Sequence, residues 1–307
     1  MKIIKLLPLL FVISFASCDK VDDPFPSELG KSIFLNKTEY IVDKDFNVGN
    51  TNELNTFINN NTWTKVEAPD NSNRRFITLE EFTGHKCTFC PDGTREIIRL
   101  SGVYNEQLIP VGIHAGGFAE PKPTANKFYT DFRAKGGHGE IYMTTFKVAG
   151  FPTGVVSRLG DANGKNDWEQ DIISIKDDAP SAILKMTNHY AASINAVRSN
   201  IEITWLESRP EDFNLQLYVT EDHIIDWQLD KGFENPNYDH RHVLRKVVND
   251  TYGKALIKSE INKTEKIEYI FTVEPGWKAQ DMEVVAFIFN SDQTSYEVIQ
   301  ANAAHVK

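Results

Sequence analysis

The sequence has few cysteines, no surplus of basic residues and no long hydrophobic run. Three cysteines among 307 residues exclude a scaffold held together by many disulfides. The formal net charge of −10, with no basic patch, excludes nucleic acid as an expected partner. No Gly-rich phosphate-binding loop and no internal repeat occur in the sequence. The length predicts two folded domains rather than one small core.

Residues 1–17 have the pattern of a signal peptide. Lys2 and Lys5 form a charged start, and the apolar run from Leu6 to Ala16 is shorter than the about 20 residues that span a bilayer. Small residues precede Cys18, and the segment resembles a bacterial lipoprotein signal in which Cys18 becomes the lipidated N-terminus. Several acyl chains on one residue would anchor the protein to a membrane. The alternative is an ordinary signal peptide with a chance cysteine.

The next two segments carry weak periodicity. Residues 18–35 are acidic and contain proline, which predicts a flexible tether between the membrane and the folded body. Residues 36–73 are rich in Asn, with turn signals at residues 59–61 and 70–73. This segment has room for a strand or two or a small appendage, and the sequence leaves its structure open.

Residues 74–178 alternate between strand-like and helix-like patterns, which predicts an α/β domain. The expected strands are 76–82, 108–113 and 148–157, and Pro152 interrupts the last of them. Two of the expected helices are 94–104 and 168–175. A third lies between them; Phe128 and Phe132 mark it, and Gly136 and Gly137 end it.

From residue 179 to residue 307 the apolar residues alternate with polar ones, as in half-buried strands. Ile201, Ile203 and Trp205 form one such series, and similar series follow at residues 213–219, 269–273 and 285–289. This spacing predicts an all-β antiparallel sandwich. The aromatic residues of these strands, Trp205 and those at 213–218, are expected in its core or at an interface.

Cys87 and Cys90 form a C-x-x-C motif between a predicted strand and a predicted helix. Backbone N–H groups at a helix start favour a thiolate, so Cys87 is the expected nucleophile and Cys90 the resolving thiol. In an oxidising compartment the pair can also form a disulfide that only holds the loop. A zinc site needs four ligands, and His85 with the two cysteines supplies three, so no metal or other cofactor is expected.

The motif and its surroundings resemble the thioredoxin superfamily. Glu81 shares a strand face with Ile77 and Leu79 and matches the buried acid that assists proton transfer in that family. Gly150-Phe151-Pro152-Thr153 matches the loop in which a cis-proline shapes the substrate groove. The resemblance implies catalytic roles for Cys87, Cys90 and Glu81, and substrate binding by Phe151, Pro152 and Thr153.

The motif also departs from the small thioredoxins. Lys86 stands where they carry an aromatic residue, and Thr88-Phe89 replaces their Gly-Pro. Lys86 and His85 are expected to act as local cations that lower the pKa of Cys87.

A second group of polar residues lies at His240 and His242. On one strand these side chains would point to the same face and could grip a metal. The alternative, a packed turn and strand of the sandwich, needs no metal. His114 and His138 have no partner pattern and are expected to be ordinary polar residues.

Residues 75–307 together resemble the lipoproteins related to the 28-kDa outer membrane protein family. Beyond the segments already named, the match includes residues 219–222 and 238–245. The resemblance implies an outer-membrane lipoprotein with a thioredoxin-like domain and a C-terminal β-sandwich, and it supplies no settled activity. The first hypothesis for the activity, from the C-x-x-C pair and its setting, is exchange of thiols and disulfides on envelope or surface proteins. The alternative is a non-catalytic binding or structural lipoprotein whose C-x-x-C is a structural disulfide.

Overall fold

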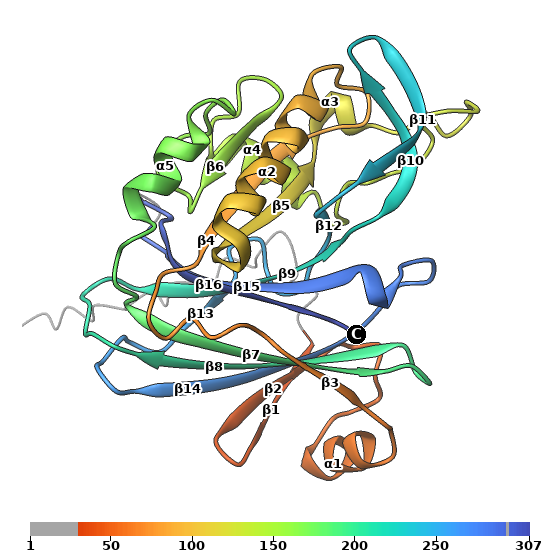
Figure 1. Ribbon diagram of the computed structural model, residues 1–307. Coiled ribbons are helices and arrows are strands. Elements are labelled where there is room, and N and C mark those ends of the chain that lie inside the picture. The colour runs from red at the N-terminus through yellow and green to blue at the C-terminus, as the bar shows by residue number, and fades with distance from the viewer. Residues whose placement is uncertain (1–29, 293–294) are drawn as a thin grey trace, which may run out of the picture.

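The computed structural model describes residues 30–292 and 295–307, which form a mostly β-sheet protein with most of its helices at one end (Figure 1). The predicted signal peptide, Cys18 and most of the predicted tether lie outside the described residues.

A six-stranded sheet forms one layer. All its neighbouring strands are antiparallel except β2 and β14, which are parallel. In spatial order its strands are β1 (Lys31–Leu35), β2 (Thr38–Val42), β14 (Thr264–Thr272), β8 (Ala196–Trp205), β7 (Ala182–Ala191) and β3 (Thr64–Glu67).

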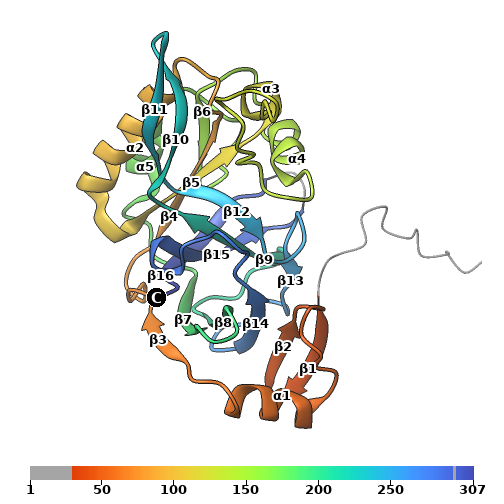
Figure 2. The ribbon, with the colours of Figure 1, turned by 90° about the vertical axis from the view of Figure 1, so that its right-hand side faces the viewer.

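An eight-stranded sheet forms the second layer and extends beneath the helices. Its strands in spatial order are β16 (Val298–His305), β15 (Met282–Asn290), β9 (Phe213–Glu221), β12 (Val243–Val247), β5 (Leu108–His114), β4 (Ile77–Thr83) and β6 (Thr153–Val156), and β13 (Lys254–Ala255) pairs with β9. A separate hairpin consists of β10 (Ile224–Asp230) and β11 (Phe233–His240). This hairpin stands at the helical end, opposite the end that carries the first two strands (Figure 2).

Five α-helices and two short 3₁₀ helices complete the described residues. They are α1 (Thr51–Asn59), α2 (Cys90–Tyr104), α3 (Gly116–Ala119), α4 (His138–Thr145), α5 (Trp168–Ile175), η1 (Asn105–Gln107) and η2 (Ala279–Asp281). Pro91 stands in the first turn of α2, where its fixed φ favours a helix start and its missing N–H costs nothing.

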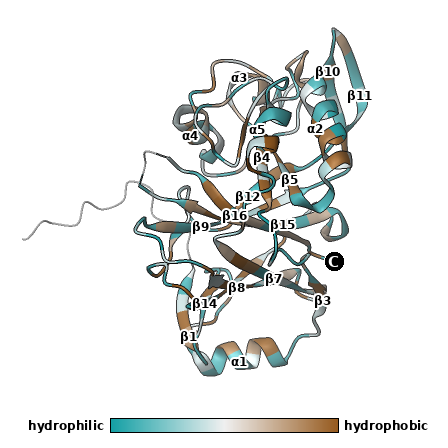
Figure 3. Cartoon of the chain, turned by 60° about the vertical axis from the view of Figure 1, so that its left-hand side comes forward, coloured by the Kyte–Doolittle hydropathy of each residue, from teal (hydrophilic) through white to brown (hydrophobic). Residues whose placement is uncertain are grey.

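The hydrophobic core fills the space between the two large sheets and continues under the helices. Leu184 and Trp205 of the six-stranded sheet pack with Leu217 and Ala286 of the eight-stranded sheet. A further cluster lies between β4, α2 and α5 and includes Trp168. Hydrophobic residues accordingly concentrate in β4, β5 and β16, whereas the β10–β11 hairpin is mostly hydrophilic (Figure 3).

The eight-stranded sheet contains strands from both sides of the predicted boundary at residues 178 and 179. β4, β5 and β6 precede the boundary, and β9, β12, β15 and β16 follow it. The link is the parallel pair β5–β12, where Val243 lies opposite Gly112. The two parts therefore share one hydrogen-bonded sheet.

A buried ion pair lies at this junction and contacts residues on its other side. Arg158 donates hydrogen bonds to Glu80 at 2.7 Å and 3.0 Å and to the Tyr218 hydroxyl at 2.9 Å. The guanidinium also lies 4.7 Å from the ring centre of Phe287 and 4.9 Å from that of Phe289. Because Glu80 and Arg158 are both buried, each charge depends on the other for compensation.

Three local predictions need correction. Residues 31–35, expected in the tether, form β1. No helix surrounds Phe128 and Phe132, because Phe128 has a positive φ of 56°. Gly137 precedes α4 as its N-cap and does not end a helix. The aromatic spacing arose because both side chains are buried against other rings.

Candidate functional site

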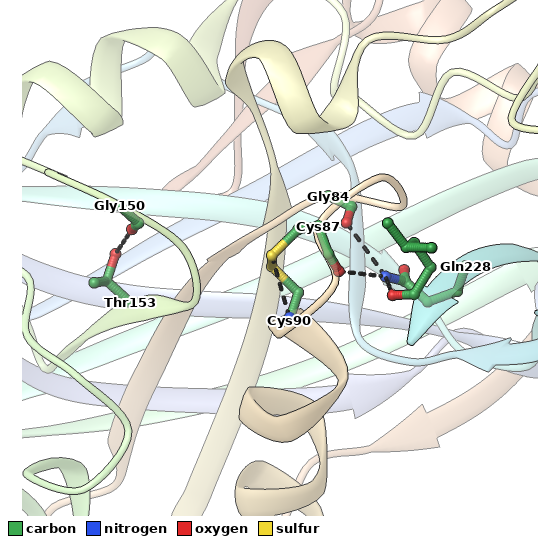
Figure 4. Close-up of a disulfide and its surroundings, with 7 residues drawn as sticks. Gly84, Cys87, Cys90, Gly150, Thr153 and Gln228 are labelled. Atoms are coloured by element: carbon green, nitrogen blue, oxygen red, sulfur yellow. Dashed lines mark hydrogen bonds between the residues drawn. A yellow bond between two sulfur atoms is a disulfide. The ribbon is translucent and has the colours of Figure 1, made fainter. Parts of the chain in front are cut away.

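The two cysteines form a disulfide at the start of α2 (Figure 4). Strand β4 leads into the loop at residues 84–89, and the helix begins at Cys90. The Cys90 backbone N–H donates to Sγ of Cys87 at 3.1 Å. Cys87 is 3% exposed and Cys90 is 1% exposed. The helix start therefore presents an N–H group to the sulfur that the sequence predicts to be the nucleophile.

Glu81 lies buried in β4, as its position on the strand predicts. Burial raises the pKa of its carboxyl group to about 8, since water no longer stabilises the charged form. Oε1 of Glu81 has no hydrogen-bond partner among the described residues. A carboxyl group in this state can hold and release a proton near neutral pH.

Gly93 is the residue at which helix α2 packs closely against this carboxyl group, and no sequence pattern singled it out. A Cβ atom at position 93 would lie 2.9 Å from Cβ of Pro152 and would also contact Glu81. Glu81, Pro152 and the first turn of α2 therefore meet at one point. Gly93 lies just before the helix predicted at residues 94–104, so the sequence offered no signal for this contact.

Pro152 follows a cis peptide bond, as the resemblance implies. In the pairing of β4 with β6, Thr153 lies opposite Phe82, which places Pro152 beside the end of β4. The Thr153 hydroxyl donates to the Gly150 carbonyl at 2.8 Å, as Figure 4 shows. The expected strand at residues 148–157 is thus shortened to β6, which begins after the proline.

An apolar hollow of about 340 Å³ adjoins the Phe151–Pro152 loop. Phe118 and Phe151 meet there edge to face, with ring centres 5.7 Å apart. The lining residues are Gly117, Phe118, Met143, Val148, Ala149, Gly150 and Phe151.

Three buried histidines cluster at the cysteine loop, and one of them, His85, is part of the loop. His85, His114 and His240 are each at most 4% exposed, and the rings of His114 and His240 are 5.8 Å apart. Phe132 packs against all three, with ring centres between 4.6 Å and 5.8 Å. Burial lowers the pKa of His85 to about 4 and that of His240 to about 4, and it lowers the pKa of His114 well below its ordinary value.

These positions correct two predictions. His85 is neutral at neutral pH and therefore cannot act as a cation beside Cys87. His114 is a core residue, not an ordinary polar one. The sequence offered no signal for this cluster, because its members come from three separate segments.

His240 and His242 do not form a pair on one strand face. Strand β11 ends at His240, whose Nε2 lies 3.2 Å from the Trp227 carbonyl oxygen. His242 has a positive φ of 53°, and its Nδ1 faces Asp222 at 3.3 Å. Within residues 30–292 and 295–307, no group of three or more His, Cys, Asp or Glu side chains could hold a metal ion.

The fold and site define a β-rich protein with a disulfide where a strand meets a helix. The chain belongs to the outer membrane protein Omp28 family, whose sequence pattern it matches over residues 140–307. This membership places the protein in the outer membrane. The matched region includes Pro152 and the β10–β11 hairpin and excludes both cysteines.

The solved structures that are similar to this chain include the following two. HBP35 of Porphyromonas gingivalis is 18% identical, with a TM-score of 0.57 and coverage of 76% of each chain. Protein AGR_C_4864 from Agrobacterium tumefaciens is 11% identical, with a TM-score of 0.47, 75% of this chain and 94% of that chain being covered. The first likeness concerns the fold alone.

A comparison with curated proteins finds no match. In the described part of the chain, no helix is both long and apolar enough to cross a membrane.

Proposed function

We propose that this protein exchanges thiols and disulfides on envelope or surface proteins through Cys87 and Cys90. The observation that carries the proposal is the buried Glu81, with a raised pKa, beneath a disulfide at a helix N-terminus. A disulfide that only held the loop would not need an ionisable carboxyl group in an apolar site, where burial of the charge is costly.

We also assign residues 74–178 to a thioredoxin-like domain and residues 179–307 to a β-sandwich.

The reduced pair would transfer two electrons to a substrate disulfide. The Cys87 thiolate attacks one substrate sulfur, forms a mixed disulfide and releases the other substrate sulfur as a thiolate. Glu81 then takes the proton of Cys90, whose thiolate attacks Sγ of Cys87. The substrate leaves with two reduced sulfurs, and the Cys87–Cys90 disulfide is formed. The reverse sequence oxidises a substrate dithiol.

The Phe151–Pro152–Thr153 loop would receive the extended chain of the substrate. The neighbouring hollow is lined mainly by apolar side chains, including Phe118 and Met143. Such a surface binds an aliphatic or aromatic side chain by removing apolar area from water. We expect substrates that carry an apolar residue close to the reacting cysteine.

We further propose that Cys18 is lipidated and that the segment after it tethers the folded body to the outer membrane. The small residues before Cys18 and the acidic composition after it support this assignment. Mass spectrometry of the mature protein tests it. An N-terminus at unmodified Cys18, or at another residue, would refute the anchor.

A non-catalytic role for the disulfide is the second candidate. The low exposure of both cysteines favours it, because a buried disulfide is protected from attacking thiols. In this case the protein would be a binding or structural lipoprotein, with its surface hollow available to a partner.

The reduction potential of the pair separates the two candidates. Exchange activity is measured on a disulfide-bonded peptide with the natural chain, with Cys87→Ser and with Cys90→Ser. The proposal expects a potential well above about −300 mV and loss of turnover in both variants. A potential below about −300 mV, together with no exchange by the natural chain, would exclude the catalytic function.

A further inference from the structure

The β10–β11 hairpin is bonded to the loop that carries Cys87, although more than a hundred residues separate them in sequence. Leu229 donates its backbone N–H to the His85 carbonyl at 2.8 Å, and Lys231 donates to the Thr88 carbonyl at 2.9 Å. The Gly232 N–H donates to the Thr88 hydroxyl at 2.9 Å. The hairpin therefore pairs with the loop almost as an added strand.

Gln228 completes this contact with its side chain. It is 3% exposed, and its Nε2 donates to the Cys87 carbonyl at 3.0 Å and to the Gly84 carbonyl at 3.4 Å. A β-bulge between Asp226 and Gln228 shifts the strand register next to this side chain. The side-chain amide of Gln228 is thereby held against the backbone carbonyl of Cys87.

Ion pairs connect the hairpin to the first turns of α2. Arg95 donates to Asp230 at 3.0 Å, and Nζ of Lys231 lies 3.1 Å from Asp92. The same hairpin thus contacts both the cysteine loop and the helix that follows it.

The hairpin contacts determine the direction of the peptide groups in the loop. A trans peptide carries its C=O and N–H on opposite sides, so a carbonyl that faces the hairpin turns the next N–H away from it. Since the Cys87 and Thr88 carbonyls face the hairpin, the N–H groups of Thr88 and Phe89 point the other way. Figure 4 shows the two sulfur atoms on the side of the loop opposite Gln228.

We propose that the hairpin, acting through Gln228, is a positioning element that keeps loop N–H groups directed toward Cys87 and so favours its thiolate. N–H dipoles fixed in this direction stabilise negative charge on sulfur, in addition to the N–H of Cys90. This inference rests on the proposed exchange function, because a thiolate at Cys87 is what that function uses. Gln228 touches no substrate and acts only through the loop.

The test is the pKa of the Cys87 thiol, read from the pH profile of its alkylation. All proteins carry Cys90→Ser, so that Cys87 titrates alone in the site, and Cys18→Ser, so that no other thiol reacts. We expect Gln228→Leu to raise the pKa of Cys87 by about one unit, because release of the loop would remove about one N–H hydrogen bond to the charged sulfur. Asn237→Leu makes the same chemical change at an exposed position of β11 and should leave the profile unchanged.

Amide hydrogen exchange of Leu229 and Lys231 reports whether the hairpin still pairs with the loop. If Gln228→Leu disturbs folding, Gln228→Met keeps the length of the side chain and removes its hydrogen-bonding amide. An unchanged pKa of Cys87 in a folded Gln228→Leu or Gln228→Met protein overturns the positioning role.

The outcome does not depend on any protein substrate. A hairpin effect on the pKa without exchange activity would contradict the proposed function alone. Exchange activity with an unchanged pKa in the variants would contradict the hairpin alone.

Discussion

Gly93 in α2 lies against the carboxyl group of Glu81, so that a Cβ atom added at position 93 would come within 2.2 Å of Oε1. Because the same Cβ would also press on Pro152, the smallest side chain cannot be accommodated without movement of the site. The glycine is therefore part of the packing that holds the buried acid beneath the disulfide.

Gly93→Ala should destabilise the fold by about 1–3 kcal/mol, the usual cost of overpacking a core. Gly102→Ala in the same helix is the matched control, because nothing lies within 4 Å of a Cβ at that position. The control should gain about 0.5–1 kcal/mol from the better helix propensity of alanine. Urea unfolding of both variants measures the difference. Equal effects of the two substitutions would contradict the close contact at Gly93.

Glu81→Gln should remove one source of pH dependence. The pKa of Glu81 is about 8 in the folded protein and about 4.5 in the unfolded chain, so the folded state binds the extra proton between these values. The contribution of the Glu81 proton to the free energy of unfolding is therefore complete below pH 4.5. It falls by about 1.4 kcal/mol per pH unit as the pH rises to 8.

The check for Glu81 is urea unfolding at several pH values. The natural chain should lose stability relative to Glu81→Gln as pH rises from about 5 to 8. A constant difference between the two proteins over this range would show that the carboxyl group does not titrate there.

His85→Phe should change stability in the acidic range. The pKa of His85 is about 4 in the fold against an ordinary 6.5, so between these values the unfolded chain binds a proton that the folded chain does not. Stability is lost as pH falls from 6.5 toward 4. Phenylalanine keeps an aromatic ring beside Phe128 and Phe132 and carries no proton, so the variant should lose less stability with acid. Thermal unfolding from pH 7 to pH 4.5 tests this, and parallel curves would contradict it.

Arg158→Met should destabilise the protein by about 3–5 kcal/mol, because Glu80 is left buried without its cation. Lys147→Met is the control: Lys147 and Arg158 both have a positive φ, and Lys147 pairs with Asp161, but this ion pair is exposed. Loss of the exposed pair should cost less than about 1 kcal/mol. Denaturant unfolding compares the variants, and an effect at Arg158 no larger than that at Lys147 would contradict the dependence of the buried Glu80 on Arg158.

Phe118→Ala should weaken substrate binding if the apolar hollow receives a substrate side chain. In exchange with a peptide that carries an aromatic residue beside its cysteine, KM should rise several-fold while kcat changes little. Ile173→Ala, an exposed apolar residue of α5, is the control. A KM equal to that of the natural chain would remove the hollow from the substrate site.

Much of the local structure was predictable from residue patterns. Helix α5 and the strand that carries Ile201 and Trp205 follow their apolar spacing, because one face of each is buried, and β4 follows an apolar run that is buried on both faces. The predicted burial of Glu81 is confirmed for the same reason. The helix expected at Phe128 and Phe132 was wrong, because tertiary burial of two rings can imitate helical spacing.

The sequence by itself determined the chemistry that can occur: a cysteine pair at a helix start and an acid on the adjoining strand. These are neighbours in the chain, and short-range backbone geometry brings them together. Only the tertiary structure decided what surrounds the pair, namely the β10–β11 hairpin behind the loop, Gly93 against Glu81, and the sheet that runs from β4 to β16. Such contacts depend on long-range strand pairing, which local residue patterns do not specify.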